Sequence, residues 1–407
     1  MRNSKRWGLY FLGVWLLVAC DGTTVPEPTV QPEQADGAPS VSLSKAFTSP
    51  TSFTVAFQAT GDDPDGDALT YLWDFGDGGT AEGANPTHTF QEGGEFSVTV
   101  TVSDGTSSAS DATTLRLRPA DSPDVFILGF AGRCGFAGFG CFNAPNGNEA
   151  YLDKEEAQTL QALAEPFTEA GLDARWWSAR AHLNGRSRGF FNFRSEPGFA
   201  DTTTLVGSIE ESWIGDFDNP TRLVLVGHSH GAVWASLLAW NSPDVTFDYL
   251  VYLDGICSVW WSDHRPFIRA GFDARGLRRP FPLNTDEAGR PCEALDVPGK
   301  TSQDIDDVVP DNVGVALEIQ ASRLSIPSDA EPNHRPDGLK TNIYTLRSRN
   351  LHAGSSAVHV KGTQSMTWVG DMLKAGGLLG EQAGLETQAV PDLKELVPAP
   401  EGWEYLD

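Results

Sequence analysis

A serine between two glycines is the residue whose type and setting point most directly to chemistry. Ser229 is the centre of the segment 227–231, Gly-His-Ser-His-Gly, which follows an apolar run at 223–226 and precedes an Ala-, Leu- and Trp-rich run at 232–240. The first run is typical of a buried parallel strand and the second of a buried helix. A direct turn from strand to helix crowds the flanking positions, which then need glycine, and leaves the hydroxyl at a helix N-terminus. We interpret Ser229 as a nucleophile; the simpler alternative is a helix-capping serine.

An activated serine needs a base that takes its proton, so the surrounding elements must bring one to Ser229. Apolar runs and 3.6-residue spacing predict strands at 125–130, 174–177, 223–226, 247–253, 313–320 and 342–346, and helices at 151–170, 204–217 and 359–374. This alternation predicts a parallel sheet with helices on both faces over residues 122–378. The Trp-, Arg- and Pro-rich stretch 256–312 is expected to form a cap, and residues 379–407 a surface tail.

With the serine turn in place, residues 122–378 resemble the α/β-hydrolase family, although its two leading strands have no obvious counterpart here. The resemblance implies a Ser-Asp-His triad in that chain order. We predict Asp254 as the acid, because it ends the strand at 247–253 directly after the helix that follows the serine. Asp263, within Trp-Trp-Ser-Asp-His, is the alternative. The simpler explanation of Asp254 is a cap on a turn or helix.

Two histidines lie where this family places its base, between the last strand and the last helix. His359 runs straight into the pattern of the closing helix, so we predict it as the base. His352 is the alternative. The simpler explanation of either is a histidine in a surface loop.

The predicted site also needs N–H donors for the negative oxygen that forms during attack. The backbone N–H of His230 is one candidate, and the other lies near Phe130 or Ala131 at the end of the strand 125–130. The side chains of His228 and His230 are expected to point away from the attack side of Ser229.

Residues 39–118 have a different pattern, in which short alternating runs are separated by Gly, Asp and Pro turns. This pattern predicts a small antiparallel β-sandwich. The motif Trp-Asp-Phe-Gly-Asp-Gly at 73–78, together with the segments 85–90 and 94–105, resembles the PKD domain. The resemblance implies a spacer or weak adhesion module that contacts glycans or proteins and is seldom catalytic.

Four aspartates crowd one loop of this first domain: Asp62, Asp63, Asp65 and Asp67. Carboxylates this close favour a hard cation, so a structural calcium ion is one hypothesis, and a solvated acidic turn is its equal alternative. The predicted serine chemistry itself needs no cofactor.

The N-terminus has the pattern of an export signal. Three basic residues precede an apolar segment at 7–18, which is too short to span a bilayer. It ends in Leu-Val-Ala-Cys20, which resembles the lipobox of bacterial lipoproteins and implies that residues 1–19 are removed and Cys20 is acylated, anchoring the chain to a membrane. A simple signal peptide with a buried cysteine is the alternative. Residues 20–38, rich in Pro, Thr, Glu and Gln, are predicted to be a disordered tether. We therefore expect the protein in the bacterial cell envelope, facing the periplasm or the exterior.

Four further cysteines are expected to form two disulfides in that oxidising compartment: Cys134, Cys141, Cys257 and Cys292. Three connectivities are possible, and nearness in sequence favours pairing the first with the second and the third with the fourth. Free buried thiols are the alternative.

Composition narrows the class of partner. The chain has 55 acidic and 29 basic residues and a formal net charge of −26, which argues against nucleic acid. The sequence thus predicts a two-domain, lipid-anchored serine hydrolase acting on small-molecule or lipid esters. The alternatives are a serine amidase or peptidase, and a non-catalytic adhesion or glycan-binding lipoprotein with a degenerate hydrolase domain.

Overall fold

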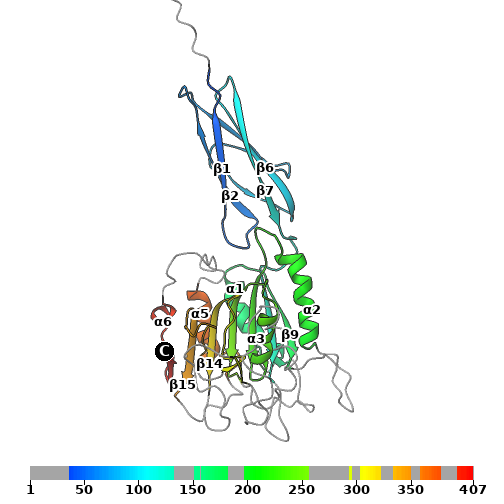
Figure 1. Cartoon of the computed structure of the whole chain (residues 1–407), viewed down its shortest axis with the longest axis vertical. Helices are drawn as coiled ribbons and strands as arrows, with labels where there is room; N and C mark the ends of the chain where they lie inside the picture. Colours follow the sequence, from blue (N-terminus) through cyan, green and yellow to red (C-terminus); the bar gives the residue numbers. More distant parts are fainter. Residues whose placement is uncertain are drawn as a thin grey trace, which may run out of the picture.

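The computed structural model describes residues 36–132, 151–155, 157–181, 197–255, 293–295, 303–321, 333–349, 358–376 and 392–406. They form two bodies stacked along the long axis of the molecule (Figure 1). Seven residues singled out above lie outside these ranges: Cys20, Cys134, Cys141, Cys257, Asp263, Cys292 and His352. In the described part of the chain, no helix is long and apolar enough to cross a membrane.

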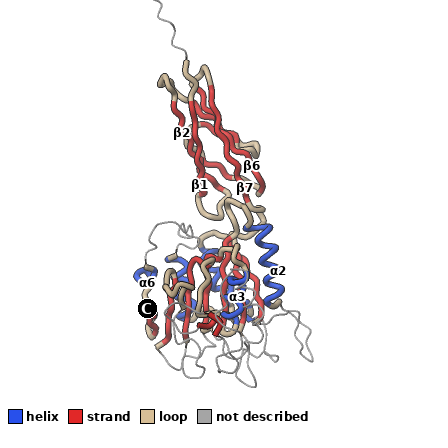
Figure 2. Tube along the Cα trace, in the orientation of Figure 1, coloured by secondary structure: helices blue, strands red, loops and turns tan. Residues whose placement is uncertain are grey.

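The N-terminal body consists of strands and loops (Figure 2). Its strands are β1 (Ser40–Phe47), β2 (Thr54–Asp62), β3 (Thr70–Asp74), β4 (Thr80–Glu82), β5 (Thr87–Thr89), β6 (Gly94–Ser103) and β7 (Ser108–Leu117). They pair antiparallel in a sheet of order β1-β2-β5 and a sheet of order β4-β3-β6-β7. Trp73 and Phe75 are both buried between the sheets, with Phe57 against them. The predicted sandwich and its aromatic core are confirmed. The short strands β4 and β5 were not predicted, because no apolar run marks them in the sequence.

The second body is built on a sheet that, among the described residues, has the strand order β16-β15-β14-β11-β10-β8-β9. Its strands are β8 (Val125–Ala131), β9 (Ala174–Arg180), β10 (Arg222–His228), β11 (Phe247–Leu253), β14 (Val313–Gln320), β15 (Ile343–Ser348) and β16 (Trp403–Leu406), beside a separate small ribbon of β12 (Glu293–Leu295) and β13 (Gln303–Asp304). All neighbours from β9 to β15 are parallel, and β16 is antiparallel to β15.

Helices cover both faces of this sheet, as the alternating sequence pattern predicts. They are α1 (Thr159–Glu169), α2 (Phe199–Ile209), α3 (Gly231–Asn241), α5 (Gln364–Ala375) and α6 (Leu393–Leu396), with a 3-10 turn η1 (Tyr151–Asp153) and a π turn η2 (Glu210–Ile214). Apolar side chains of α2 and α3 form one core with one face of the sheet, and those of α1 and α5 form a second core with the other face. The central strand β10 is apolar from Leu223 to Val226, where both of its faces are buried.

Four predicted elements differ from the structure. The helix expected over 204–217 begins earlier, as α2 from Phe199 to Ile209, and continues only as the π turn η2 to Ile214. The helix expected over 151–170 is broken before Thr159, because Gln158 has a left-handed backbone with φ of 48°. The closing helix begins at Gln364 rather than at 359, so His359 lies in the turn before it. The segment 379–407, expected to be a surface tail, contributes the buried Leu393 and the edge strand β16. Its sequence lacks a long apolar run because an edge strand is half exposed.

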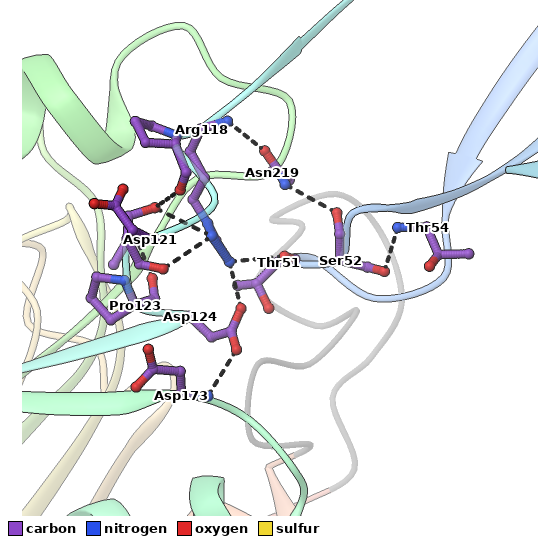
Figure 3. A network of polar contacts seen from close by, with 12 residues as sticks. Thr51, Ser52, Thr54, Arg118, Asp121, Pro123, Asp124, Asp173 and Asn219 are labelled. Atoms are coloured by element: carbon purple, nitrogen blue, oxygen red, sulfur yellow. Dashed lines mark hydrogen bonds and ion pairs between the residues drawn. The ribbon is translucent and has the colours of Figure 1, made fainter. Parts of the chain in front are cut away.

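The two bodies meet at a buried arginine that ends the first domain (Figure 3). The Arg118 guanidinium donates to the Thr51 carbonyl at 3.0 Å and pairs with Asp124, just before β8. The second oxygen of Asp124 accepts the N–H of Asp173, just before β9, at 2.8 Å. The Arg118 charge also lies 5.0 Å from the centre of the Phe53 ring. One side chain therefore ties loops of the β-sandwich to the starts of two strands of the parallel sheet.

A loop of the second domain pairs with the last strand of the first. The Asp218 N–H donates to the Arg116 carbonyl at 2.7 Å, and the Arg116 N–H donates to the Asp218 carboxylate at 2.8 Å. The Asn219 side chain accepts from the Arg118 N–H at 2.9 Å and donates to the Ser52 carbonyl at 3.0 Å (Figure 3). These reciprocal bonds fix how the two domains sit on each other.

Candidate active site

Ser229 occupies the sharp turn between β10 and α3, as predicted. Its φ is +55°, a left-handed conformation that is strained for a residue with a side chain. The flanking glycines are required by close packing. A Cβ on Gly227 would lie 2.5 Å from the Ala232 nitrogen, and one on Gly231 would collide with the Phe130 carbonyl oxygen. The turn leaves Ser229 partly exposed, while most of β10 is buried.

Asp254 lies beside Ser229 at the same edge of the sheet. The Ser229 N–H donates to the Leu253 carbonyl at 3.0 Å, so Asp254 follows the residue that pairs with the candidate nucleophile. Its N–H donates to the Ile319 carbonyl at 2.7 Å, and its carboxylate accepts the Ala321 N–H at 2.9 Å. Asp254 too has a left-handed backbone, with φ of 52°. The carboxylate is thus fixed at the carboxyl ends of β11 and β14.

His359 reaches this edge from the turn before α5 and is 1% exposed. Its imidazole stacks on that of His228, with 4.0 Å between ring centroids and 31° between planes. Its backbone carbonyl accepts a bond of 2.7 Å from the buried Thr159 hydroxyl. The predicted base is therefore packed against the immediate neighbour of Ser229.

The position of His228 corrects an expectation. Its side chain was expected to point away from the attack side of Ser229, but it packs against the candidate base. Side chains alternate along a strand, so His228 shares the face of Val224 and Val226. That face is covered by α1 and α5, and His359 lies in the turn before α5.

Tyr151 is a member of this cluster that sequence reasoning missed. Its hydroxyl accepts the Gly132 N–H at 2.8 Å and is hydrogen bonded to Nδ1 of His228. Its ring centroid lies 5.3 Å from that of His359. The residue lies 20 positions beyond the end of β8, and no spacing rule connects the two segments. Only the partial helical pattern that begins at Tyr151 marked it as ordered.

Burial sets the charge state of the cluster. Burial and the neighbouring His228 lower the pKa of His359 to about 2, so its imidazole is neutral at neutral pH and, by itself, binds a proton weakly. Burial raises the pKa of Tyr151, so its hydroxyl keeps its proton.

The segment predicted to hold the oxyanion lies against the serine turn. The carbonyl oxygens of Phe130 and Ala131 face the backbone of Gly231, at the start of α3, so closely that no side chain fits between. A Cβ on the next residue, Gly132, would be 2.7 Å from Cβ of Ser229. His230 caps α3 with a helical φ of −59°, so its N–H belongs to the turn as predicted. Backbone from two strand ends thus packs around the serine turn.

The aspartate loop makes local hydrogen bonds. Asp63 accepts the N–H groups of Asp65 and Asp67 at 2.9 and 3.1 Å, and Asp65 accepts the Gly37 N–H at 2.6 Å. Within the described ranges, no group of three or more His, Cys, Asp or Glu side chains is arranged to hold a metal ion. The calcium ion therefore stays a prediction.

Fold and site together define a chain with an all-β domain followed by a domain on a largely parallel sheet, with a strained serine at its carboxyl edge. Residues 37–118 match the family model of the PKD domain. The first domain is therefore of the PKD type, as its motifs predicted.

Curated relatives share this first domain. The chain is 47% identical over 51 residues to the pre-pro-metalloprotease PrtV of Vibrio cholerae. This match covers 12% of this chain and 6% of that protein. It is 35% identical over 79 residues to collagenase ColQ1 of Bacillus cereus. This match covers 19% of this chain and 8% of that protein. The chain thus spans less than a tenth of these relatives.

Solved structures also match parts of this chain. The PKD1 domain of Vibrio cholerae PrtV is 34% identical and covers 20% of this chain and 96% of its own, with a TM-score of 0.18. A polysaccharide deacetylase from Bacillus cereus covers 72% of this chain and 95% of its own at 10% identity, with a TM-score of 0.21. Scores this low carry no argument about the second domain.

Proposed function

We propose that this protein is an exported, lipid-anchored serine hydrolase of the α/β-hydrolase type that cleaves carboxylic esters. The observation that carries the proposal is the left-handed Ser229 between two glycines at the carboxyl end of a central parallel strand. That conformation costs on the order of 1–3 kcal/mol, and such strain concentrates at functional sites. A serine that merely caps a helix needs no such strain.

In the proposed reaction, Ser229 attacks the ester carbonyl while His359 takes its proton. Asp254 orients the imidazole and stabilises its charged form. The oxyanion accepts bonds from the N–H of His230 and from an N–H at the end of β8. The intermediate collapses as the ester C–O bond breaks, and His359 gives its proton to the departing alcohol. Water, deprotonated by His359, then attacks the acyl-serine and releases the acid and the free Ser229 hydroxyl, and no metal or cofactor is needed.

Replacing the nucleophile tests this proposal. Ser229→Ala should lower hydrolysis of p-nitrophenyl acetate by roughly a thousandfold or more and abolish labelling by a fluorophosphonate probe. Ser236→Ala is a matched control, because this buried serine lies on α3 and bonds the Tyr252 hydroxyl instead. Equal turnover in the wild type and in Ser229→Ala would refute the assignment.

Peptide bonds are the second candidate substrate, since the same triad cleaves amides. The curated relatives that share the PKD segment are named a metalloprotease and a collagenase, which favours testing peptides. A panel of esters of graded acyl length, compared with peptide anilides, separates the two. A wild-type protein that the probe does not label would instead favour the non-catalytic adhesion lipoprotein.

Membrane attachment through Cys20 and a location in the bacterial envelope belong to the same proposal. The support is the lipobox-like segment before Cys20. We also propose that the PKD-type domain contacts a glycan or a protein.

A further inference from the structure

The Tyr151 hydroxyl is placed to set the protonation pattern of His228. Its oxygen accepts the Gly132 N–H at 2.8 Å, which leaves one proton and one further lone pair for a second partner. Among the described residues, that partner is Nδ1 of His228, and either atom can be the donor. When the tyrosine donates, Nδ1 accepts, and a neutral imidazole carries its proton on Nε2. Because the tyrosine is 5% exposed, water does not compete for this bond.

The imidazole of His228 packs against the candidate base, His359. His228 covers one face of His359 at a centroid distance of 4.0 Å. The Tyr151 ring contacts His359 as well, at 5.3 Å and with 56° between the planes. The three rings are each at most 5% exposed. A rotation of the His359 ring would require both neighbours to move.

The backbone around His359 is fixed independently of these rings. The Ser365 hydroxyl donates to the Val358 carbonyl at 2.7 Å, and the Lys361 N–H donates to the Ala157 carbonyl at 2.9 Å. These bonds place the turn on α1 and on the start of α5. The backbone contacts therefore set where His359 lies, and the two aromatic neighbours set how its ring is oriented.

We propose that Tyr151 and His228 are positioning residues for the base: the tyrosine hydroxyl locks His228 as its Nε2–H form, and the locked ring orients the imidazole of His359 toward Ser229. This inference rests on the proposed function, in which His359 takes the serine proton. In this role neither residue takes part in the proton transfer itself. Their contribution is orientation, which lowers the barrier of the chemical step and leaves substrate binding unchanged.

The test compares Tyr151→Phe with the control Tyr252→Phe in the full chain. Both tyrosines are buried and hydrogen bonded, but Tyr252 pairs with Ser236 on the opposite face of the sheet. Tyr151→Phe should lower kcat for p-nitrophenyl acetate and the rate of fluorophosphonate labelling by roughly 10- to 100-fold, with KM within about threefold. Tyr252→Phe should leave these values at the wild-type level. Equal rates in both variants, or a loss confined to KM, would overturn the proposal.

Two substitutions at His228 separate orientation from bulk packing. The amide oxygen of His228→Asn can still accept from the Tyr151 hydroxyl, whereas His228→Leu removes the acceptor. The asparagine variant should retain at least about fivefold more activity than the leucine variant, and Tyr151→Phe should add little further loss to His228→Leu, because the two act as one unit. Equal loss in both His228 variants would contradict the hydroxyl lock.

A spectroscopic measurement tests the protonation form of His228 without relying on turnover. In protein with ¹⁵N-labelled histidine, the ring resonances of His228, assigned by their loss in His228→Asn, should have the pattern of the Nε2–H form. An Nδ1–H pattern would overturn the lock even in an active enzyme. A wild-type protein inert to the fluorophosphonate probe would instead refute the proposed function, and the positioning role would fall with it.

Discussion

At the residue scale, the candidate site is defined by positions where only one kind of side chain fits. Gly227 and Gly231 flank the serine because their neighbours leave no room for a Cβ. The left-handed serine between them follows from that geometry. Short-range constraints of this kind are visible in the sequence, which is why the segment 227–231, between an apolar strand pattern and an apolar helix pattern, was enough to identify the turn.

A second residue-scale feature is a carboxyl group buried away from the site. Asp306 is 3% exposed. Burial, with the neighbouring Glu318 adding to it, raises its pKa to about 7. The folded protein therefore binds this proton more tightly than the unfolded chain does.

This raised pKa predicts how stability depends on pH. Below about pH 4 the carboxyl is protonated in both states, and between about pH 4 and 7 the folded state loses stability as pH rises. Asp306→Asn should remove this loss and raise stability at pH 8, relative to pH 4, by on the order of a few kcal/mol. Urea unfolding at both pH values measures it. Asp371→Asn, an exposed carboxylate on α5, is the control, and an identical slope in both variants would contradict the prediction.

At the element scale, the start of α1 holds the turn that contains the candidate base. Thr159 is the first residue of α1, and its buried hydroxyl bonds a carbonyl 200 residues away in the chain, that of His359. The helix therefore has a role that its own sequence pattern does not reveal. A buried carbonyl without a partner costs about 1–3 kcal/mol, so the bond matters for placement as well as for stability.

A pair of substitutions tests this anchor. Thr159→Val keeps the shape but removes the donor, so it should lower the melting temperature and slow fluorophosphonate labelling of Ser229 by roughly tenfold. Thr159→Ser keeps the donor, so its melting temperature and its labelling rate should stay near the wild-type values. Thr168→Val, at the exposed end of the same helix, where the hydroxyl bonds the Glu165 carbonyl at 3.1 Å, is the control. Normal labelling in Thr159→Val would show that the bond does not position the base.

At the scale of the whole molecule, the two domains are arranged with the candidate site far from their joint. The chain enters β8 and β9 at Asp124 and Asp173, so the amino ends of the parallel strands face the PKD-type domain (Figures 1 and 3). The serine lies at the carboxyl ends, about 20 Å away along strands of seven residues. The first domain therefore lies at the amino ends of the strands, opposite to the edge that carries the candidate site.

The buried arginine at the joint predicts coupled unfolding. Arg118→Met leaves Asp124 without its charged partner and should cost about 3–5 kcal/mol. Calorimetry should show a single coupled transition in the wild type and two separate transitions in the variant, with Ser229 labelling unchanged in the cold. Arg349→Met, which removes the exposed ion pair with Glu404, serves as the control. A single, unshifted transition in Arg118→Met would contradict the coupling.

The sequence by itself determined what depends on neighbouring residues: the β-sandwich with its Trp73 and Phe75 core, the order of the strands along the chain, and the glycine-flanked serine turn. These follow from local sterics and from which faces are buried. Only the tertiary structure decided that Tyr151 and His228 surround His359, that Arg118 meets Asn219, and that β16 completes the sheet. Each of these contacts joins segments that are tens to hundreds of residues apart in the chain. Such contacts depend on how the whole chain packs, so no periodic pattern in the sequence indicates them.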